Sequence, residues 1–549
     1  ATLEVQAGWR YLNDYLRNMD AATPEEIRRV ARQVARPENK TTAFVIPGGA
    51  ASRPPEAYAE VRSISGSAAA GRELHKGPLQ NHSIYPTPAG WKHPLSFARH
   101  PHRVDYPEAV QMAIGGAKAF FLPDHELPLI DMTIYVKAGA VDLQDSEAGL
   151  TDLLEGTIIR GGTESLSPVE LAMLLDDNAI KMGVDIGLEE TAIKLSVMAS
   201  DWERGLGILQ EVLTRPRFDA KVLEVAKEQE MAGLQRQGED AQAVAMRESM
   251  IWHFKGHPYG RDPLAAARVI PTVARDDLRR FLSSHFVPAN MVVAVSGDIQ
   301  LNQVRESLGR FISGLPAEAA PQRHLAQPPP TPPVVTLIHK PGQVQSNVVA
   351  VLPGLTRTDP RYWKSNLLMS VFGGSDSLMY TRLRDDLGYV YSAGFYQTAK
   401  WQAGLLVGII GCKGDKAADA ILETVHIMKS LQQGIPGREL ELKRLDTLNS
   451  FVFNVDSKAE LVQAYSRYAM RQEPLDTLGR IQDGYFSATA QELKGLALQL
   501  LAPREIQIHV VADKTTPVPK ADGRTLTLEE DLKAMAQTLG LPFREIELR

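Results

Sequence analysis

The sequence lacks several features that would assign it to a class at once. It contains one cysteine in 549 residues, Cys412, which excludes a disulfide framework and any zinc cluster built from cysteines. It has no strong excess of one charge, because 60 Lys and Arg face 66 Asp and Glu. That balance argues against a nucleic-acid partner, which needs a basic surface. The longest near-continuous apolar stretch, Ala403 to Cys412, is about half of what a membrane-spanning helix requires, so we expect no membrane span.

What the sequence does contain is ordinary globular composition, with 44% hydrophobic and 23% charged residues, and an internal repeat. A helix, a proline and a β-rich run occur in that order three times, with the proline at Pro37, Pro288 and Pro503. The second and third prolines are 215 positions apart. Gly139 and Gly354, which each follow a strand and precede a helix, are also 215 positions apart. One offset at both ends of a segment indicates two homologous units in tandem, preceded by the end of a third.

Each unit opens with two strands joined by a turn, Lys118–Leu122 and Ile130–Val136 in the first, and continues with helices and further strands. The absence of a regular strand–helix alternation predicts an α+β fold, with helices packed on an antiparallel-rich sheet. Proline-rich and small-residue stretches mark the boundaries. The predicted segments are the end of a preceding unit (1–49), a linker (50–104), a first complete unit (105–315), a proline-rich linker (316–333), a second complete unit (334–514) and a tail (515–549).

The first helix of the first complete unit lies within the segment EAGLTDLLEGTIIRGGT, Glu147–Thr163. It resembles the signature helix of insulinase/pitrilysin-type zinc peptidases, the inverted zincins, in which H-x-x-E-H places two zinc-binding histidines on one helical face. The Glu of that motif takes a proton from the zinc-bound water. Here Asp152 and Gly156 occupy the histidine positions, and Glu155 alone keeps its type. Glycine donates no ligand, so we expect no complete catalytic site in this chain and a vestigial Glu155.

In the family a Glu on a later helix is the third zinc ligand. The helix predicted over Leu223–Gln235 offers Glu224, Glu228 and Glu230 for that position. Asp152 with Glu228 or Glu230 could hold a hard cation. Solvated carboxylates on helix faces are the simpler interpretation.

His253 and His257 are four residues apart, a spacing that suits a metal pair on a helix. Gly256 and Pro258 break the helix between and after them, so the two rings would not share a face. The segment resembles a His-Pro-Tyr-Gly turn of the same family that binds no metal, and we expect a structural turn.

The second complete unit carries a Gly-Gly-Ser run from Gly373 and the segment LRDDLGYVY from Leu383. A phosphate-binding loop would continue with Lys-Ser/Thr, which is missing here. The run resembles the second signature of the same zinc peptidases, whose Arg and Tyr reach across the chamber to the zinc site, hold the substrate backbone and stabilise the oxyanion. The matching residues are Arg384 and Tyr391, and a guanidinium and a phenol are suitable donors to a negative charge. The alternative is that Arg384 pairs with Asp385 or another neighbour and that Tyr391 lies in a core.

The resemblance extends from the first proline phrase to about Asp513. Family members made of one long chain have four such units, with zinc in the first and the Arg/Tyr pair in the fourth. On that plan this chain is the C-terminal part of a zinc metalloendopeptidase and forms one bowl of a two-bowl chamber. It would bind no zinc and be inactive alone. The zinc and general base would lie on the N-terminal part or on a partner chain, and the substrates would be enclosed peptides.

A second function stays open: a non-catalytic binding or scaffold subunit derived from the same family. The retained Arg384 and Tyr391 favour the peptidase half, and the lost ligands favour the scaffold if no partner chain exists. One unpaired cysteine is compatible with either the periplasm or the cytoplasm. The resemblance to large bacterial members favours the periplasm over the cytoplasm.

Overall fold

The computed structural model describes two units of the chain, 1–91 and 92–549, each by itself. The residues described are Tyr15, Met19, 21–36, Asn39, 90–92 and 102–548. In the first unit α3 (Pro24–Val34) begins at Thr23, whose hydroxyl accepts a hydrogen bond from the Glu26 N–H while the Glu26 carboxylate accepts one from the Thr23 N–H. The β-rich run that follows Pro37, and most of the predicted linker 50–104, lie outside the described residues.

The first six-stranded sheet of unit 92–549 has the order β1-β2-β6-β3-β5-β4. Its strands are β1 (Val110–Ile114), β2 (Ala117–Pro123), β3 (Leu129–Val136), β4 (Lys181–Ile186), β5 (Thr191–Met198) and β6 (Met291–Gly297). Its helices are α4 (Leu150–Thr157), α5 (Pro168–Asp177), α6 (Trp202–Thr214), α7 (Ala220–Glu239), α8 (Ala241–His253), α9 (Ala266–Val269), α10 (Arg275–His285) and α11 (Leu301–Ser313). The two opening strands, β2 and β3, do not pair with each other as the turn between them suggests, because β6 lies between them.

The second six-stranded sheet has the order β14-β7-β11-β8-β10-β9. Its strands are β7 (Val334–His339), β8 (Gln345–Gly354), β9 (Val390–Ala399), β10 (Gly404–Lys413), β11 (Gln507–Ala512) and β14 (Phe543–Glu547), with a small ribbon of β12 (Pro517–Pro519) and β13 (Thr525–Thr527). Its helices are α12 (Tyr362–Gly373), α13 (Leu378–Tyr380), α14 (Ala417–Gln433), α15 (Gly437–Ser450), α16 (Lys458–Met470), α17 (Thr477–Ser487), α18 (Ala490–Leu500) and α19 (Leu528–Leu539).

The two sheets repeat one topology. Strands β2, β6, β3, β5 and β4 of the first sheet occupy the places of β7, β11, β8, β10 and β9 in the second. Most neighbouring strands are antiparallel, and the parallel pairs are β2 with β6, β7 with β11, and β7 with β14. The predicted α+β fold with tandem homologous units is therefore confirmed. The tail supplies β14 next to β7, in the place that β1 has next to β2.

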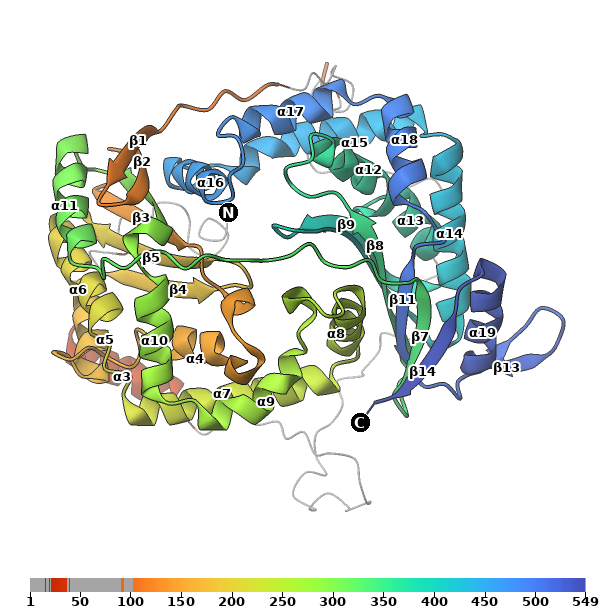
Figure 1. The fold of residues 1–549 in the computed structure, drawn as a ribbon, viewed down its shortest axis with the longest axis horizontal. Helices are drawn as coiled ribbons and strands as arrows, with labels where there is room; N and C mark the ends of the chain where they lie inside the picture. The colour runs from red at the N-terminus through yellow and green to blue at the C-terminus, as the bar shows by residue number, and fades with distance from the viewer. Residues whose placement is uncertain are drawn as a thin grey trace, which may run out of the picture. The chain divides into compact units, whose positions relative to one another are not determined.

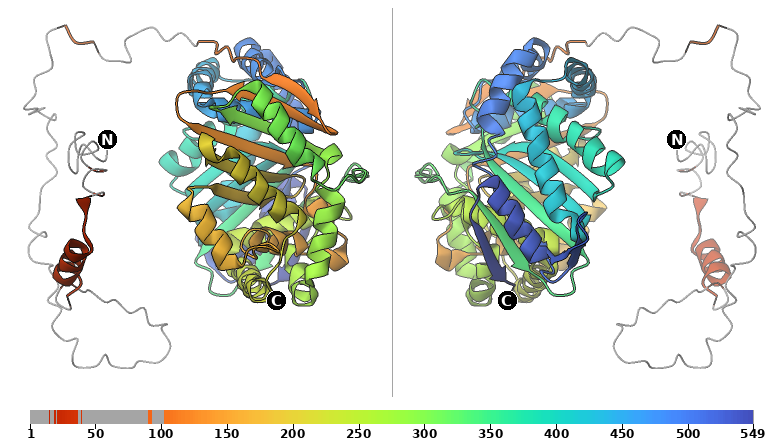
Figure 2. Two further views of the ribbon diagram at one scale, coloured as in Figure 1. Left: turned by 90° about the vertical axis from the view of Figure 1, so that its left-hand side faces the viewer. Right: turned by 90° about the vertical axis from the view of Figure 1, so that its right-hand side faces the viewer.

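Both faces of each sheet are covered, which explains why the central strands are apolar throughout. All seven residues of β6 are buried. Consecutive strand residues point to opposite faces, so Phe120 and Phe121 enter two different hydrophobic clusters. Figure 2 shows the outer helices lying across each sheet, with α6 and α11 on the first and α14 and α19 on the second.

Each half of unit 92–549 also covers the other half's sheet. Helix α8 packs on β8 and β11, and α16 packs on β2, β3 and β6. Val244 and Ala245 of α8 share a buried cluster with Val349, while Val462 of α16 shares another with Val292. Figure 1 shows α8 and α16 between the two sheets. This reciprocal packing joins the halves through apolar surface, the main source of stability in such contacts.

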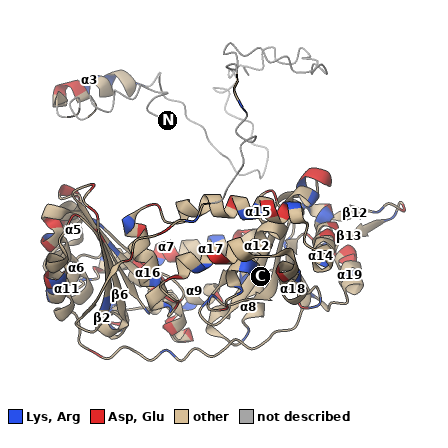
Figure 3. Ribbon diagram, turned by 90° about the horizontal axis from the view of Figure 1, so that it is seen from above, with Lys and Arg blue, Asp and Glu red and all other residues tan. Residues whose placement is uncertain are grey.

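The surface carries both charges side by side. Figure 3 shows Lys and Arg interspersed with Asp and Glu along the described helices. In the described part of the chain, no helix is long and apolar enough to cross a membrane.

Candidate functional site

Helix α4 carries the degenerate metal motif. It begins after Gly149, which has φ +83° and whose missing Cβ would lie 2.7 Å from the Ile270 side chain. Leu150, Leu153, Leu154 and Thr157 are buried and fix one face of the helix against the core. Asp152 and Glu155 are therefore left on the exposed face of α4, the face from which the ligands of a metal motif would project.

Three carboxylates meet at this face. Glu230 of α7 is close enough to Asp152 and Glu155 that burial and then their negative charges raise its pKa. The side chain of Asp152 keeps contact with solvent, but the surrounding protein raises its pKa as well. The Glu155 carboxylate accepts a hydrogen bond of 2.6 Å from the backbone N–H of Ile186, at the end of β4. The structure thus brings Asp152, Glu155 and Glu230 together as an acidic cluster.

The other two predicted acids of α7 point elsewhere. Glu224 forms an ion pair of 3.0 Å with Lys227, and Glu228 is exposed. Of the three glutamates offered by this helix, Glu230 alone faces the position of the lost histidines.

The acidic cluster does not fit the zinc that the family resemblance implies. Gly156 has room for a side chain, because its Cβ would meet only Ala226 at an ordinary 3.7 Å, but it provides no donor. Zinc in such sites is held largely by imidazole or thiolate, and neither is present here. Across the residues that the structure describes, no group of three His, Cys, Asp or Glu side chains is arranged to hold a metal ion.

The two histidines four residues apart support the turn that follows α8 and its contacts with Gln507 and the proline-rich linker. His253 Nδ1 lies 2.9 Å from Gln507 Oε1, and His257 Nε2 lies 3.0 Å from the carbonyl oxygen of Ala326. Gly256 between them has φ +78°, so the helix has ended before His257 is reached. Burial lowers the pKa of His253. The two rings have separate structural partners and do not converge on one point.

Arg384 and Tyr391 are brought together at the beginning of β9. Arg384 lies in a π-helical turn, Thr381–Asp386, and its Nη1 donates to the carbonyl oxygens of Val390 at 3.0 Å and Tyr391 at 2.9 Å. The Tyr391 side chain is 51% exposed. Arg384 is therefore held by backbone carbonyls rather than by Asp385, and Tyr391 does not lie in a core. Strand β9 is the edge of its sheet, so both side chains stand beside unpaired backbone groups.

The Gly-Gly-Ser run allows α12 to pack closely against β9. A Cβ on Gly373 would lie 2.2 Å from Cβ of Phe395, so the end of α12 can cross β9 only with glycine at this position. Ser377 then caps α13, accepting a hydrogen bond of 3.1 Å from the Tyr380 N–H. A groove of about 410 Å³ follows β9 here, lined by 373–376, Tyr380 and 393–396.

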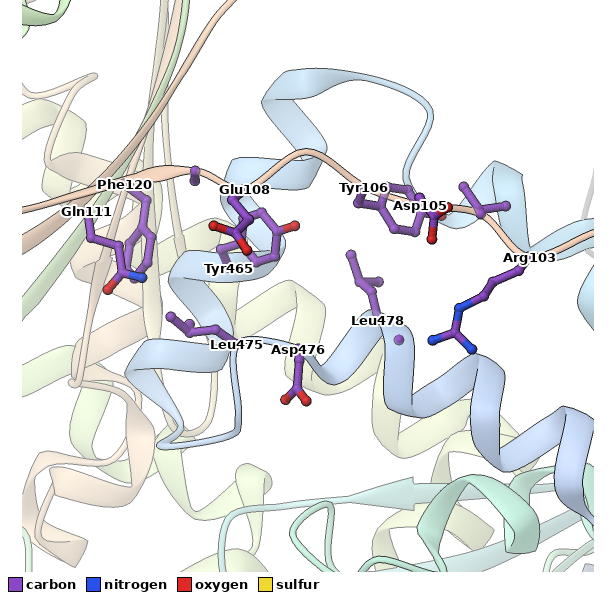
Figure 4. A pocket seen from close by; sticks show the side chains of 13 residues that line it. Arg103, Asp105, Tyr106, Glu108, Gln111, Phe120, Tyr465, Leu475, Asp476 and Leu478 are labelled. Atoms are coloured by element: carbon purple, nitrogen blue, oxygen red, sulfur yellow. The ribbon is translucent and has the colours of Figure 1, made fainter.

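A second cavity, of about 380 Å³, lies where the segment before β1 crosses α16 and α17 (Figure 4). The Val104 N–H donates to Gln482 Oε1 at 2.8 Å, and Gln482 Nε2 donates back to the Val104 carbonyl at 2.9 Å. The Tyr465 hydroxyl donates to the carbonyl oxygen of Pro107 at 3.0 Å. These contacts attach the segment that leads into the first sheet to helices of the second half.

No motif in the sequence points to the residues that hold the two hairpin tips, β4–β5 and β9–β10, at the junction between the halves. Arg471, just after α16, holds the Glu190 carboxylate through Nη2 at 2.5 Å and Nε at 3.1 Å. Glu189 accepts a hydrogen bond of 2.9 Å from the Trp401 N–H. Neither contact belongs to a motif or a periodic pattern. The offset of 215 residues makes the two tips near-equivalent positions of the repeat, but that equivalence does not predict that they touch.

Comparison with known proteins shows what the chain is similar to. Residues 272–445 match the family described as the peptidase M16 inactive domain. An uncharacterized zinc protease of Mycobacterium tuberculosis is 22% identical over 386 residues, which cover 68% of this chain and 85% of that protein. The predicted resemblance to zinc peptidases of this type is confirmed.

Solved structures show the same fold. The peptidase M16 inactive domain from Pseudomonas fluorescens gives a TM-score of 0.69 at 20% identity, covering 75% of this chain and 99% of that one. The periplasmic protease PqqL from Escherichia coli gives a TM-score of 0.65 at 12% identity. That match covers 91% of this chain and 52% of PqqL, so the chain spans about half of that structure.

Proposed function

Starting from the match to the inactive domain of M16 peptidases, we propose that this chain is the non-catalytic half of a zinc metalloendopeptidase that encloses and hydrolyses peptides. The zinc and the general base belong to an N-terminal part or a partner chain. This chain binds no zinc and is inactive alone. Its contribution is to bind the peptide and to stabilise the negative charge that develops on the scissile carbonyl.

The observation that carries this proposal is the arrangement of Arg384 and Tyr391. The two carbonyl hydrogen bonds of Arg384 both use Nη1, so Nε and Nη2 keep donors to offer to a substrate. The Tyr391 side chain, which follows one of these two carbonyls along the strand, is exposed and offers its hydroxyl as a further donor. Donors that are already fixed in place cost little reorganisation when charge develops on a carbonyl oxygen, and this is how an oxyanion is stabilised.

The edge position of β9 supplies the other requirement, which is to hold an extended peptide. An edge strand presents backbone N–H and C=O groups that a peptide can pair with as an added strand. The groove lined by 373–376 and 393–396 follows this edge and has room for side chains. A peptide on β9 would pass Tyr391 and Arg384 at the beginning of the strand.

Replacing Arg384 with alanine tests the proposal in the assembled peptidase. We expect kcat to fall by about a hundredfold, the size of a lost oxyanion donor, while the zinc content of the complex stays unchanged. Arg382→Ala is the matched control, because Arg382 lies in the same turn but is held by Glu423 at 2.8 Å. An unchanged kcat in R384A, or an equal loss in both variants, would contradict the assignment.

The alternative function is a binding or scaffold subunit without any part in catalysis. Gly156 favours it, since the loss of that ligand is complete and its neighbours Asp152 and Glu230 have become an acidic cluster. A chain that binds peptides, has no catalytic partner and gains no activity with any zinc-bearing half would establish this alternative.

We also propose a periplasmic location, supported by the likeness in fold to a protease described as periplasmic. Osmotic-shock fractionation of cells that express the protein tests it. Recovery of the chain with cytoplasmic markers would contradict it.

A further inference from the structure

A cavity of about 300 Å³ lies at the junction of the two halves of unit 92–549. Its walls come from segments far apart in the sequence: the end of β3, the tip of the β4–β5 hairpin, the loop after β8, the tip of the β9–β10 hairpin and the end of α16. The charged and aromatic residues that line it are Lys137, Glu189, Arg357, Lys400, Trp401, Arg471 and Glu473. None of them belongs to the motifs discussed above.

The walls of this junction cavity are fixed by hydrogen bonds between the hairpin tips. Glu189 accepts from the Trp401 N–H at 2.9 Å and from the Tyr259 hydroxyl. The Tyr259 oxygen in turn accepts from the Gln402 N–H at 3.3 Å. Both tips are therefore held in one arrangement by these hydrogen bonds.

Three carboxylates around the cavity are held by arginines, and Glu189 is held only by the neutral donors named above. Glu190 is held by Arg471, and Glu473 accepts from Arg357 Nε at 2.9 Å. Asp142 nearby is held in two hydrogen bonds by Arg323. Of the four cations in the wall, Arg357 and Arg471 are therefore balanced by ion pairs with Glu473 and Glu190.

The two lysines are different. Lys137 Nζ lies 4.8 Å from the centre of the Trp401 ring, and Lys400 Nζ lies 5.3 Å from the centre of the Tyr259 ring. Among the residues that the structure describes, no carboxylate lies within 4.0 Å of either ammonium group. Burial lowers the pKa of both lysines. Asp142 offsets part of this effect for Lys137 and Glu189 offsets part of it for Lys400, but neither carboxylate is close enough to form an ion pair. A partly buried ammonium without a direct partner is unfavourable, and an anion bound in the cavity would reduce that cost.

Two further donors at the same place have no acceptor. Trp401 Nε1 and Arg323 Nη1 are buried and make no hydrogen bond in the described structure. Arg323 lies over the Trp401 ring, with its guanidinium carbon 5.0 Å from the ring centre. Nearly all buried donors in folded proteins have an acceptor, so these two unpaired donors make the surroundings of the cavity rich in donors and poor in acceptors.

We propose that the junction cavity binds a small oxyanion, a carboxylate or a phosphate group, with Lys137 and Lys400 as its charged ligands. The wall holds four cations and two carboxylates, and Glu190 behind it pairs with Arg471, so one positive charge is in excess and an anion is favoured over a cation. A volume of about 300 Å³ suits a small anionic group or the carboxyl end of a peptide. Because the ligand would contact both hairpin tips, its binding would also strengthen the junction between the halves. This site is independent of the peptidase assignment.

Calorimetric titration of the full chain tests the site with three probes: inorganic phosphate, a short peptide with a free C-terminal carboxylate and the same peptide as its amide. We expect binding of phosphate, of the acid peptide or of both, and at least a tenfold loss of affinity in the double variant Lys137→Gln/Lys400→Gln. Lys221→Gln/Lys429→Gln is the matched control, because it removes the same charge from two exposed lysines elsewhere. The control should bind as the wild type does.

The probes also separate the two sources of the anion. Binding of the acid peptide but not of its amide or of phosphate assigns the site to a carboxylate, and binding of phosphate alone assigns it to a phosphate group. No binding of either probe, or unchanged affinity in the double variant, overturns the proposal. Protection of Lys137 and Lys400 in the wild-type chain from an amine-reactive reagent, by whichever probe binds, is a second readout that needs no variant. Equal modification with and without both probes also overturns it.

Discussion

Glu230 faces two other carboxylates across the contact between α4 and α7. In a zinc-binding relative of this motif, two imidazoles and a metal ion would surround such a glutamate and favour its charged form. Here Asp152 supplies a like charge and Gly156 supplies nothing. The consequence is a cluster whose ionisation is unfavourable in the folded state, as the raised pKa values of Asp152 and Glu230 show.

This cluster predicts a pH-dependent effect of Asp152→Asn. A carboxyl whose pKa is raised on folding holds more protons in the folded than in the unfolded chain, so stability is lost as pH rises through the raised pKa. The variant removes that repulsion, and we expect the free energy of unfolding to rise by about 0.5 kcal/mol at pH 7.5, the size of a like-charge pair on neighbouring helix positions. At pH 3, which is below the ordinary pKa and therefore below the raised pKa of both Asp152 and Glu230, the gain should disappear.

Urea denaturation at the two pH values measures this effect. Glu228→Gln is the control, because Glu228 is exposed on α7 and removal of its charge leaves the cluster intact. The same gain for both variants, or a gain in D152N that does not change with pH, would show that the cluster has no such repulsion.

At the scale of the secondary-structure elements, close approach decides where glycine is required. The end of α12 crosses β9 at Gly373, with no space for a Cβ beside Phe395. Gly207 in the middle of α6 has nothing within 4 Å of the position of its Cβ. Replacing these two glycines with alanine should therefore change the stability in opposite directions, although both lie within helices.

We expect Gly373→Ala to lower the free energy of unfolding by about 2 kcal/mol, because the added methyl group overpacks the contact between α12 and β9. Gly207→Ala should raise it by about 0.5–1 kcal/mol, since alanine is the better helix former at an unhindered position. Thermal and urea denaturation of both variants provide the comparison. A neutral G373A would mean that α12 does not approach β9 as closely as described.

The elements could be predicted from the sequence where the signal is local or repeated. The offset of 215 residues and the two motifs predicted the tandem units and the family, and the break at Gly256 predicted the turn after α8. The choice of Glu230 among the three acids of α7 could not be predicted, because each lies on a plausible face of an amphipathic helix and only the contact with α4 distinguishes them. The pairing of β14 with β7 is equally invisible, since it joins residues some 200 positions apart.

At the scale of the whole unit 92–549, the halves are joined by apolar packing of α8 and α16 and by polar contacts at the hairpin tips. Neither has a local sequence signature, so the junction and its cavity could not be predicted. Arg471 and Glu190 form the central polar contact, with side chains 26% and 19% exposed. Each charge is stabilised mainly by the other, because both side chains are largely shielded from solvent.

Removal of one partner should therefore cost more than removal of both. We expect Arg471→Ala to lower the free energy of unfolding by about 2–3 kcal/mol, because Glu190 is left without its counter-charge. Glu190→Gln in the R471A background should restore part of the loss. A double-mutant cycle in urea measures the coupling. Additive effects of the two substitutions would contradict a direct role of this pair in joining the halves.

The account of the molecule depends on the division of labour between this chain and a zinc-bearing part. The most direct measurement is the zinc content and peptidase activity of the purified chain, alone and after recombination with an N-terminal part that carries H-x-x-E-H. We predict neither zinc nor cleavage for the chain alone, and about one zinc per complex with chelator-sensitive cleavage after recombination. Stoichiometric zinc and chelator-sensitive cleavage in the chain alone would place the active site here and contradict the account.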